Sequence, residues 1–207
     1  MRPLSCLYDD SALLVVDTSA AINLNATGCA AEILHSLPYK IAIVDVIQKE
    51  LELGRERGRR DAELTSALVA AKHLEVVSLG DGGWTHFERL VTGAAAETLD
   101  DGEAATIAYA IERNGVAVID EDKAIKICAV RHPSLLIASS LDLFGHPLVC
   151  EALGLDRLAE AVFLALRDAR MRVLPRHHEW VLDLVGVERA ALCPSLPPFL
   201  RRRNKKK

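Results

Sequence analysis

Short aliphatic runs alternate with stretches of helical periodicity along about the first 140 residues, which is the pattern of an α/β domain. The runs consist mainly of Val, Leu, Ile and Ala, as is typical of strands that are buried on both faces of a parallel sheet. The predicted strands are 13–17, 41–44, 74–79, 116–120 and 135–138.

The segments between and after these strands predict helices, and polar residues such as Asp45, a candidate N-cap, indicate where they begin. Glycines at 80–83 predict a turn, and Pro194, Pro197 and Pro198 predict the end of regular structure. The predicted helices are 20–25, 29–36, 46–53, 61–73, 84–92, 99–110, 123–130, 147–153, 156–170 and 176–186.

The order of these elements predicts one α/β domain with a helical C-terminal part. We expect an irregular lead-in at 1–12, the α/β domain at 13–146, helices packed on the same domain at 147–190, and a disordered basic tail at 191–207. The sequence contains no internal repeat and no clear interdomain linker.

Composition agrees with this fold and says little about a ligand. Half of the residues are hydrophobic and only 4% are aromatic, so the core must be built from small aliphatic side chains. The net charge of −4 does not indicate a nucleic-acid-binding protein. Charge is distributed unevenly, however, with acids gathered at 97–122 and basic residues at 55–60 and 201–207.

Cysteine spacing and hydropathy indicate a cytoplasmic protein. The five cysteines are scattered and never form a C-x-x-C pair, which argues against a disulfide framework or a zinc site and favours a reducing compartment. No charged-then-apolar leader and no apolar run of membrane-spanning length occurs, so we expect no membrane association.

Acidic side chains stand where the predicted strands end. Asp17 and Asp120 each follow an aliphatic strand, and ligands of open α/β sheets bind at the carboxyl ends of the strands. Glu50 lies on or beside the buried face of its predicted helix, and Glu103 follows the start of a helix rich in small residues. The simpler interpretations are a helix cap for Asp17 and a solvated glutamate for Glu50.

A cluster of such acids would need a cation, because crowded carboxylates repel one another and raise one another's pKa. Oxygen ligands alone favour Mg²⁺ or Mn²⁺, and such ions activate water for phosphodiester hydrolysis. The seven histidines show neither H-x-x-x-H nor H-E-x-x-H spacing, so a histidine-based metal site is not expected.

Four motifs in this order resemble a PIN domain, and in particular the branch related to VapC toxins that has a Gly-Glu-Ala motif. The motifs are Leu-Val-Val-Asp-Thr-Ser ending at Ser19, Val-Ile-Gln-Lys-Glu-Leu around Glu50, Leu-Asp-Asp-Gly-Glu-Ala around Glu103, and Val-Ile-Asp-Glu-Asp-Lys after residue 117. The resemblance covers roughly residues 12–187.

The resemblance implies a three-layer α/β/α sandwich around a parallel sheet of about five strands, and an Mg²⁺- or Mn²⁺-dependent ribonuclease. It implies further that the chain is the toxin of a toxin–antitoxin pair, with RNA as substrate, a cognate antitoxin as partner and a homodimer as the assembly. Carried over by motif, the catalytic, metal-binding acids are Asp17, Glu50, Glu103 and Asp120, with Asp122 as a fifth metal ligand. Thr18 and Ser19 are expected to position a metal-bound water or a phosphate.

Two features depart from the family pattern. The chain is longer than the compact toxins, and Glu103 stands where many members have Asp, which lengthens the ligand arm. These departures leave the number of metal ions and the substrate open.

An acidic site that binds RNA needs positive charge nearby. Candidates for phosphate contact are Arg55, Arg57, Arg59 and Arg60, for which a solvated turn is the plain alternative. The basic residues at 201–207 either bind RNA or only aid solubility.

Other functions were weighed against the ribonuclease. A haloacid-dehalogenase-type phosphatase needs a second Asp two positions after the first, where this chain has Ser19. A response-regulator receiver lacks support because the acids before the first helix are not paired. A non-catalytic PIN-like interaction module remains the alternative from another class, and metal binding distinguishes it from the enzyme.

Overall fold

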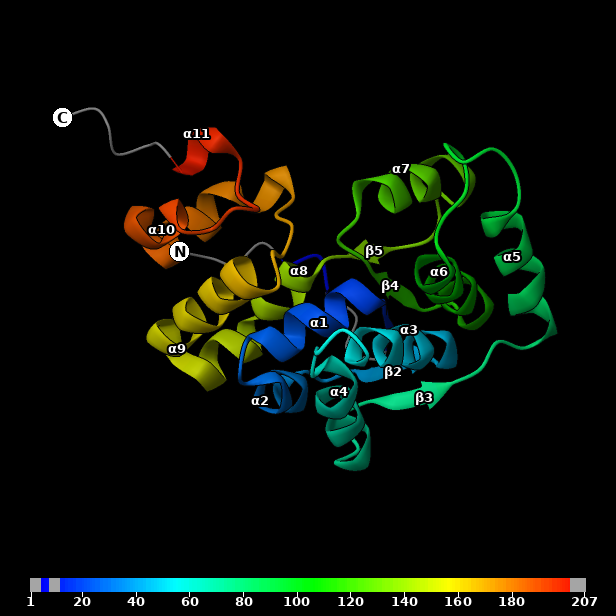
Figure 1. The fold of residues 1–207 in the computed structure, drawn as a ribbon, viewed down its shortest axis with the longest axis horizontal. Coiled ribbons are helices and arrows are strands. Elements are labelled where there is room, and N and C mark those ends of the chain that lie inside the picture. The colour runs from blue at the N-terminus through cyan, green and yellow to red at the C-terminus, as the bar shows by residue number, and fades with distance from the viewer. Residues whose placement is uncertain (1–4, 8–11, 202–207) are drawn as a thin grey trace.

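A five-stranded, fully parallel sheet forms the centre of the molecule, shown in Figure 1 as a computed structural model in which residues 5–7 and 12–201 are described. The strand order is β3-β2-β1-β4-β5. The strands are β1 (Leu13–Val16), β2 (Lys40–Val44), β3 (Glu75–Val77), β4 (Val116–Val118) and β5 (Ile137–Ala138). The predicted fold class, an α/β/α sandwich with a helical C-terminal part, is confirmed.

Helices connect every pair of consecutive strands. The connecting helices are α1 (Thr18–Ala26), α2 (Ala30–Ser36), α3 (Asp45–Arg55), α4 (Asp61–Ala70), α5 (Asp81–Val91), α6 (Asp101–Arg113) and α7 (Asp122–Arg131). After the last strand come α8 (Ser140–Phe144), α9 (Pro147–Asp168), α10 (His178–Ala191) and α11 (Pro198–Arg201), with a 3₁₀ turn at Pro175–His177. No helix among the described residues is both long and apolar enough to cross a bilayer.

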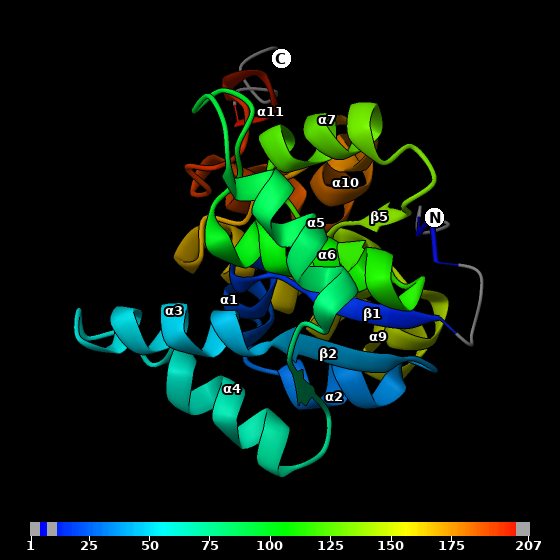
Figure 2. The ribbon, with the colours of Figure 1, turned by 90° about the vertical axis from the view of Figure 1, so that its right-hand side faces the viewer.

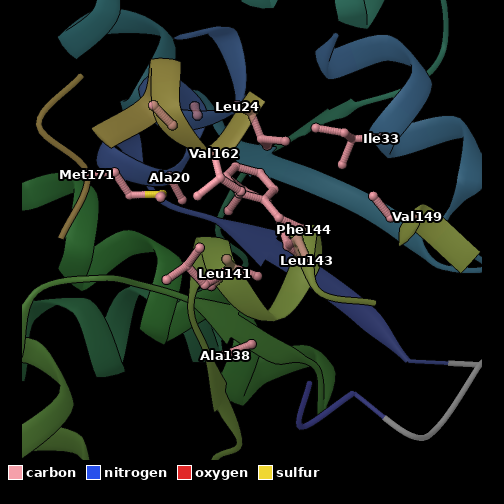
Figure 3. Close-up of a cluster of buried hydrophobic side chains, with 14 of the residues drawn as sticks. Ala20, Leu24, Ile33, Ala138, Leu141, Leu143, Phe144, Val149, Val162 and Met171 are labelled. Carbon is pink, nitrogen blue, oxygen red and sulfur yellow. The ribbon is translucent and has the colours of Figure 1, made fainter. Parts of the chain in front are cut away.

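Alternation along β1 divides the core into two layers. Leu14 and Val16 point into a cluster with α1, α2 and α9, whereas Val15 points into a cluster with α5 and α6 on the other face. Figure 2 shows these layers from the side, and Figure 3 shows part of the first cluster around Phe144. Because β1 is covered on both faces, it is fully apolar up to residue 16.

The C-terminal helices complete the first of these cores. Val162 of α9 and Trp180 of α10 belong to the same buried cluster as Leu14. The chain from 191 to 201 was expected to be disordered, but Leu196 and Leu200 are buried in that cluster. Residues 202–207, the rest of the predicted tail, lie outside the described residues.

The prediction that three prolines end regular structure holds for Pro194 and Pro197, which lie outside helices after the end of α10, and is wrong for Pro198. Pro198 is the first residue of α11. The first turn of a helix accepts proline because its N–H groups have no partner within the helix. The prediction failed because the same residue either ends a segment or opens the next helix, and local sequence does not decide between these outcomes.

The predicted turn at 80–83 is instead the start of α5, which begins at Asp81. Glu112 of α6 accepts a hydrogen bond from the N–H of Gly80 at 3.1 Å. A Cβ on Gly80 or Gly83 would lie 2.2 or 2.6 Å from a carboxylate oxygen of Glu112. These glycines are therefore present for close packing between α5 and α6, which no local pattern reveals.

Asp45 begins α3 as its first helical residue and is not the N-cap that had been predicted. Its carboxylate accepts a hydrogen bond from the Ser78 hydroxyl at 2.9 Å, beyond the end of β3. Asp45 therefore connects two neighbouring strand ends and leaves the backbone N–H groups of α3 without a side-chain cap.

Candidate active site at the carboxyl edge of the sheet

A cleft of about 610 Å³ opens at the edge where the parallel strands end. Its lining comes from segments that are far apart in the sequence. The side chains that carry charge or hydrogen-bonding groups are Asp17, Thr18, Ser19, Asn23, Glu50, Arg59, Asp100, Glu103, Asp120, Glu121, Lys123, Arg170 and Arg172. All four acids predicted to be catalytic therefore line one cavity.

Asp17 follows β1 directly and is the N-cap of α1. Its Oδ1 accepts a hydrogen bond from the N–H of Ala20 at 2.7 Å, and its Oδ2 accepts one from the Ser19 hydroxyl at 2.9 Å. The residue is only 2% exposed. Burial, and then the negative charge of Asp120, hold the pKa of Asp17 well above its ordinary value. Asp17 therefore both caps α1 and lines the cleft.

Asp120 lies two residues after β4 and is 3% exposed. Its Oδ1 accepts the N–H of Ser140 at 2.9 Å, and its Oδ2 accepts the Asn23 amide at 2.8 Å. Burial raises the pKa of Asp120, and the hydrogen bonds from Ser140 and Asn23 only partly offset that effect. No local pattern indicates these two partners, because α1 and α8 meet Asp120 only in the folded chain.

Glu103 stands in the first turn of α6 and is 9% exposed. Its backbone N–H donates to the side chain of Asp100, the N-cap, at 2.9 Å. Burial, followed by the nearby charge of Asp100, raises the pKa of the Glu103 carboxyl to about 7. Helix capping by Asp100 thus places a second negative charge beside a buried acid.

Glu50 projects from α3 toward the beginnings of α1 and α6, where it is half-buried. Its carboxylate accepts a hydrogen bond from the Thr18 hydroxyl and one from the N–H of Gly102. Burial raises its pKa, and the hydrogen bond from Thr18 opposes that rise. Glu50 is therefore not a freely solvated helix residue, because it connects three helices at the cleft.

Not every residue predicted for the site lies in the cleft. Among the four arginines at 55–60, only Arg59 lines it, and Arg59 pairs with Asp61 at 3.4 Å. Asp122, the predicted fifth metal ligand, forms an ion pair with Arg172 and lies in a neighbouring cavity. The contribution of Asp122 to metal binding stays a prediction.

Basic residues that the sequence pattern does not single out also line the cleft. Arg170 and Arg172 belong to the segment between α9 and the 3₁₀ turn, and Lys123 lies in the first turn of α7. Their only signal in the sequence is a pair of arginines flanking Met171 after a helix, and that pattern is too common to have identified them.

The donor set of the cleft has the chemistry that a hard divalent cation requires. Asp17, Asp120 and Glu103 offer carboxylate oxygens only, and the charges of Asp120 and Glu103 both raise the pKa of Asp17. Within the described residues, however, no three such side chains already converge into a ready metal cluster. The oxygens of Asp17 and Asp120 are held by hydrogen bonds instead. The residue types, carboxylates without sulfur or imidazole, are those that suit a hard divalent cation such as Mg²⁺ or Mn²⁺.

Comparison with known proteins identifies the family. One solved structure similar to the chain is the crystal structure of VapBC2 from Rickettsia felis bound to a DNA fragment from their promoter. The match has 17% identity and a TM-score of 0.46, and it covers 61% of this chain and 98% of that chain. No curated protein matches the chain significantly. The family model described as DUF3368, a PIN domain, matches residues 13–186. Since this match spans most of the sequence, the chain belongs to the PIN domain family.

Proposed function

We propose that this protein is a metal-dependent endoribonuclease. The observation that carries the proposal is the meeting of Asp17, Glu50, Glu103 and Asp120, from four separate parts of the chain, in one cleft of a PIN domain. Burying Asp17, Glu103 and Asp120 together, beside the half-buried Glu50, destabilises the fold unless a cation balances them. Such a cost is expected at a functional site and is hard to explain at a structural one.

In this proposal Asp17, Glu103 and Asp120 hold an Mg²⁺ or Mn²⁺ ion, with Glu50 beside them. The ion would supply an activated water and balance charge on the phosphate. The hydrogen bonds from Ala20 to Asp17 and from Ser140 to Asp120 fix the orientation of both carboxylates. The protein therefore keeps the acids in place before substrate arrives, which reduces reorganisation during the reaction.

Positive charge for the RNA backbone is available in the same cleft. Arg170 and Lys123 line it and form no ion pair within the described part of the chain, while Lys123 donates to the carbonyl of Ala95 at 2.8 Å. These groups can bind phosphate oxygens on either side of the acids. In this proposal Arg170 and Lys123 contact the phosphates, which is the role that the sequence analysis expects of Arg55, Arg57 and Arg60.

A role as the toxin of a toxin–antitoxin pair, in the cytoplasm and as a homodimer, belongs to the same proposal and rests on the motif resemblance. Its consequence is that expression of the active chain arrests growth. An Asp17→Asn variant, accumulating to the same level, should allow growth. The second candidate is a non-catalytic interaction module, which would need no cation.

The test is cleavage of a mixed RNA pool by purified protein with Mg²⁺, with Mn²⁺ and with chelator. We expect metal-dependent cleavage that is lost in Asp17→Asn and kept in Asp183→Asn, which makes the same change on an exposed face of α10. Thermal unfolding shows whether each variant is folded and whether the cation stabilises it. A folded wild-type protein that neither cuts RNA nor gains stability from either cation would leave the interaction module as the function.

A further inference from the structure

A second cavity of about 500 Å³ adjoins the acidic cleft. Glu121, Arg170 and Arg172 line both spaces, so the two are neighbours. The remaining lining comes from Asp122, Val173, Pro175, His178, Ser195 and Pro197, which belong to the start of α7 and to the C-terminal part of the chain.

Arg170 stands between the two cavities in a conformation that an arginine rarely adopts. Its φ of 57° lies in the left-handed region, where glycine is favoured. The side chain is exposed and forms no ion pair within the described residues. Its neighbour Met171 is 1% exposed and is anchored in the core beside Ala20, as Figure 3 shows. The left-handed residue ends α9, where the N–H of Met171 donates to the carbonyl of Ala165 at 3.0 Å. This helix ending and the buried anchor together hold an unpaired cation beside both cavities.

Arg172, unlike Arg170, forms ion pairs with acidic side chains. Its guanidinium pairs with Glu121 at 2.9 Å and also with Asp122. These pairs balance the acids at the start of α7 and connect that helix to the C-terminal part of the chain. Arg170 therefore remains as the cation in this region that is free to bind a phosphate.

An aromatic surface lies beside the second cavity. The Phe199 side chain is 64% exposed, although apolar residues on either side of it, Leu196 and Leu200, are buried. The Phe199 ring packs edge-on against His178, a lining residue, with ring centroids 5.7 Å apart. An exposed ring held by buried neighbours is a surface on which an unpaired base can stack.

We propose that the second cavity is a nucleotide subsite for single-stranded RNA, in which Arg170 binds a phosphate and Phe199 stacks on a base. The subsite lies next to the acidic cleft, so it would hold a nucleotide close to the one that is cut. This inference rests on the proposed ribonuclease function and adds to it how the RNA strand is positioned. Duplex RNA does not fit the subsite, because its bases are already stacked.

Binding of a fluorescein-labelled single-stranded oligoribonucleotide tests the proposal, measured by anisotropy in the presence of chelator so that no cleavage occurs. The variants are Arg170→Gly and Phe199→Ala. Glycine suits the left-handed backbone at 170, so this variant should fold at least as well as the wild type. We expect each variant to weaken binding by about tenfold. Phe199→Trp should restore it.

The salt dependence of binding separates the two roles. Arg170→Gly should reduce the slope of log K against log salt by about 0.7, whereas Phe199→Ala should leave the slope unchanged. The control is Arg113→Ala, which removes an exposed arginine at the far end of α6 and should bind RNA as the wild type does.

The two proposals fail in different ways. Binding that stays within about twofold of wild type in both variants, or a wild-type protein that binds no RNA, would overturn the subsite. If binding is unchanged in both variants, protein that keeps Asp17 could still show metal-dependent cleavage, and the nuclease proposal would stand without the subsite. Conversely, binding that depends on Arg170 and Phe199 without any metal-dependent cleavage would support the subsite and overturn the nuclease. Equal competition by a matched RNA duplex would also overturn the subsite.

Discussion

Buried carboxylates are the residues on which function and stability act in opposite directions in this protein. Asp17, Glu103 and Asp120 all have a pKa above the ordinary value, with burial as the largest cause in each case. The folded state therefore favours their protonated forms. A bound cation would take the place of the proton, which is the expected condition of a metal site before it is loaded.

The first residue-scale prediction is a loss of stability as the pH rises. The pKa of Glu103 goes from its ordinary 4.5 to about 7 on folding. Between these values the folded chain holds a proton that the unfolded chain has released, so the free energy of unfolding decreases as pH rises through this window. In chelator, Glu103→Gln should be more stable than wild type at pH 8 by up to about 3 kcal/mol and equal to it near pH 4.

Urea denaturation across this pH range measures the effect. Glu151→Gln, a change at an exposed position of α9, should follow the wild-type curve. Identical pH dependence in Glu103→Gln and wild type would show that Glu103 titrates normally and is not held in the buried position described.

The second residue-scale prediction concerns Asp142, a fully buried acid outside the cleft that the sequence reasoning overlooked. It accepts hydrogen bonds from the Ser139 N–H at 2.8 Å, the Ser139 hydroxyl at 2.6 Å and Arg176 at 2.5 Å. Burial alone would raise the pKa of Asp142, but hydrogen bonding to His177 and Ser139 outweighs burial and holds this pKa well below its ordinary value.

Asp142→Asn should therefore lower the free energy of unfolding by about 2–4 kcal/mol at neutral pH. Since the pKa is depressed, the contribution is complete above the ordinary value of 3.8 and is lost as the pH falls below it. The matched change is Asp168→Asn, whose exposed pair with Arg167 should contribute less than about 1 kcal/mol. Similar losses in the two variants, measured by urea denaturation, would contradict a buried ionic role for Asp142.

At the scale of elements, the site depends on how closely the start of α6 approaches α1 and α3. Asp100 caps α6, and Gly102 packs against Glu50 and Thr18. A Cβ at 102 would lie 2.5 Å from a Glu50 carboxylate oxygen and 2.8 Å from the Thr18 hydroxyl. The glycine of the Gly-Glu-Ala motif is thus required by packing between helices.

We predict that Gly102→Ala displaces Glu50, lowers the free energy of unfolding by about 1–3 kcal/mol and reduces RNA cleavage. Gly82→Ala is the control, because a Cβ there meets only a Glu112 carbon at 4.0 Å and a helical Ala is more stable than Gly. It should raise stability by up to about 1 kcal/mol and leave cleavage unchanged. A Gly102→Ala protein as stable and active as wild type would contradict the packing role.

At the scale of the whole molecule, one hydrophobic core joins both ends of the described chain. Leu7 near the N-terminus, Val162 of α9 and Leu200 of α11 belong to one buried cluster. Among the C-terminal helices, α9 packs on α1 and α2, and α10 packs on α9, so the α/β part would expose a large apolar face without them. The helical part is therefore a layer of this domain and not a separate unit.

A chain cut after residue 146 should accordingly lose cooperative thermal unfolding and aggregate, although it retains all five strands. A chain ending at 201 keeps every described member of the core and should unfold as the full chain does. Circular dichroism during heating compares the two. Cooperative unfolding of the shorter chain would mean that the C-terminal helices are dispensable for the fold.

Local patterns were sufficient for the strands, for most of the helices and for the two acids that end β1 and β4. Aliphatic periodicity reports burial, and Asp17 and Asp120 follow immediately in the sequence. Helix periodicity placed Glu50 on or beside a buried face, and the small residues after Glu103 placed it near the strand ends, but their assignment as catalytic residues came from the family motifs. Their predicted catalytic roles stay untested, although both now lie in the cleft.

The sequence by itself determined the α/β order of elements, the acids at the carboxyl ends of strands, and the family. Only the tertiary structure decided which groups surround those acids, namely Asn23 and Ser140 on Asp120, and Arg170 in the same cleft. It also decided that the C-terminal segment joins the core. The physical reason is that local periodicity records which side chains are buried, whereas hydrogen bonds and charge contacts between distant segments exist only once the chain has packed.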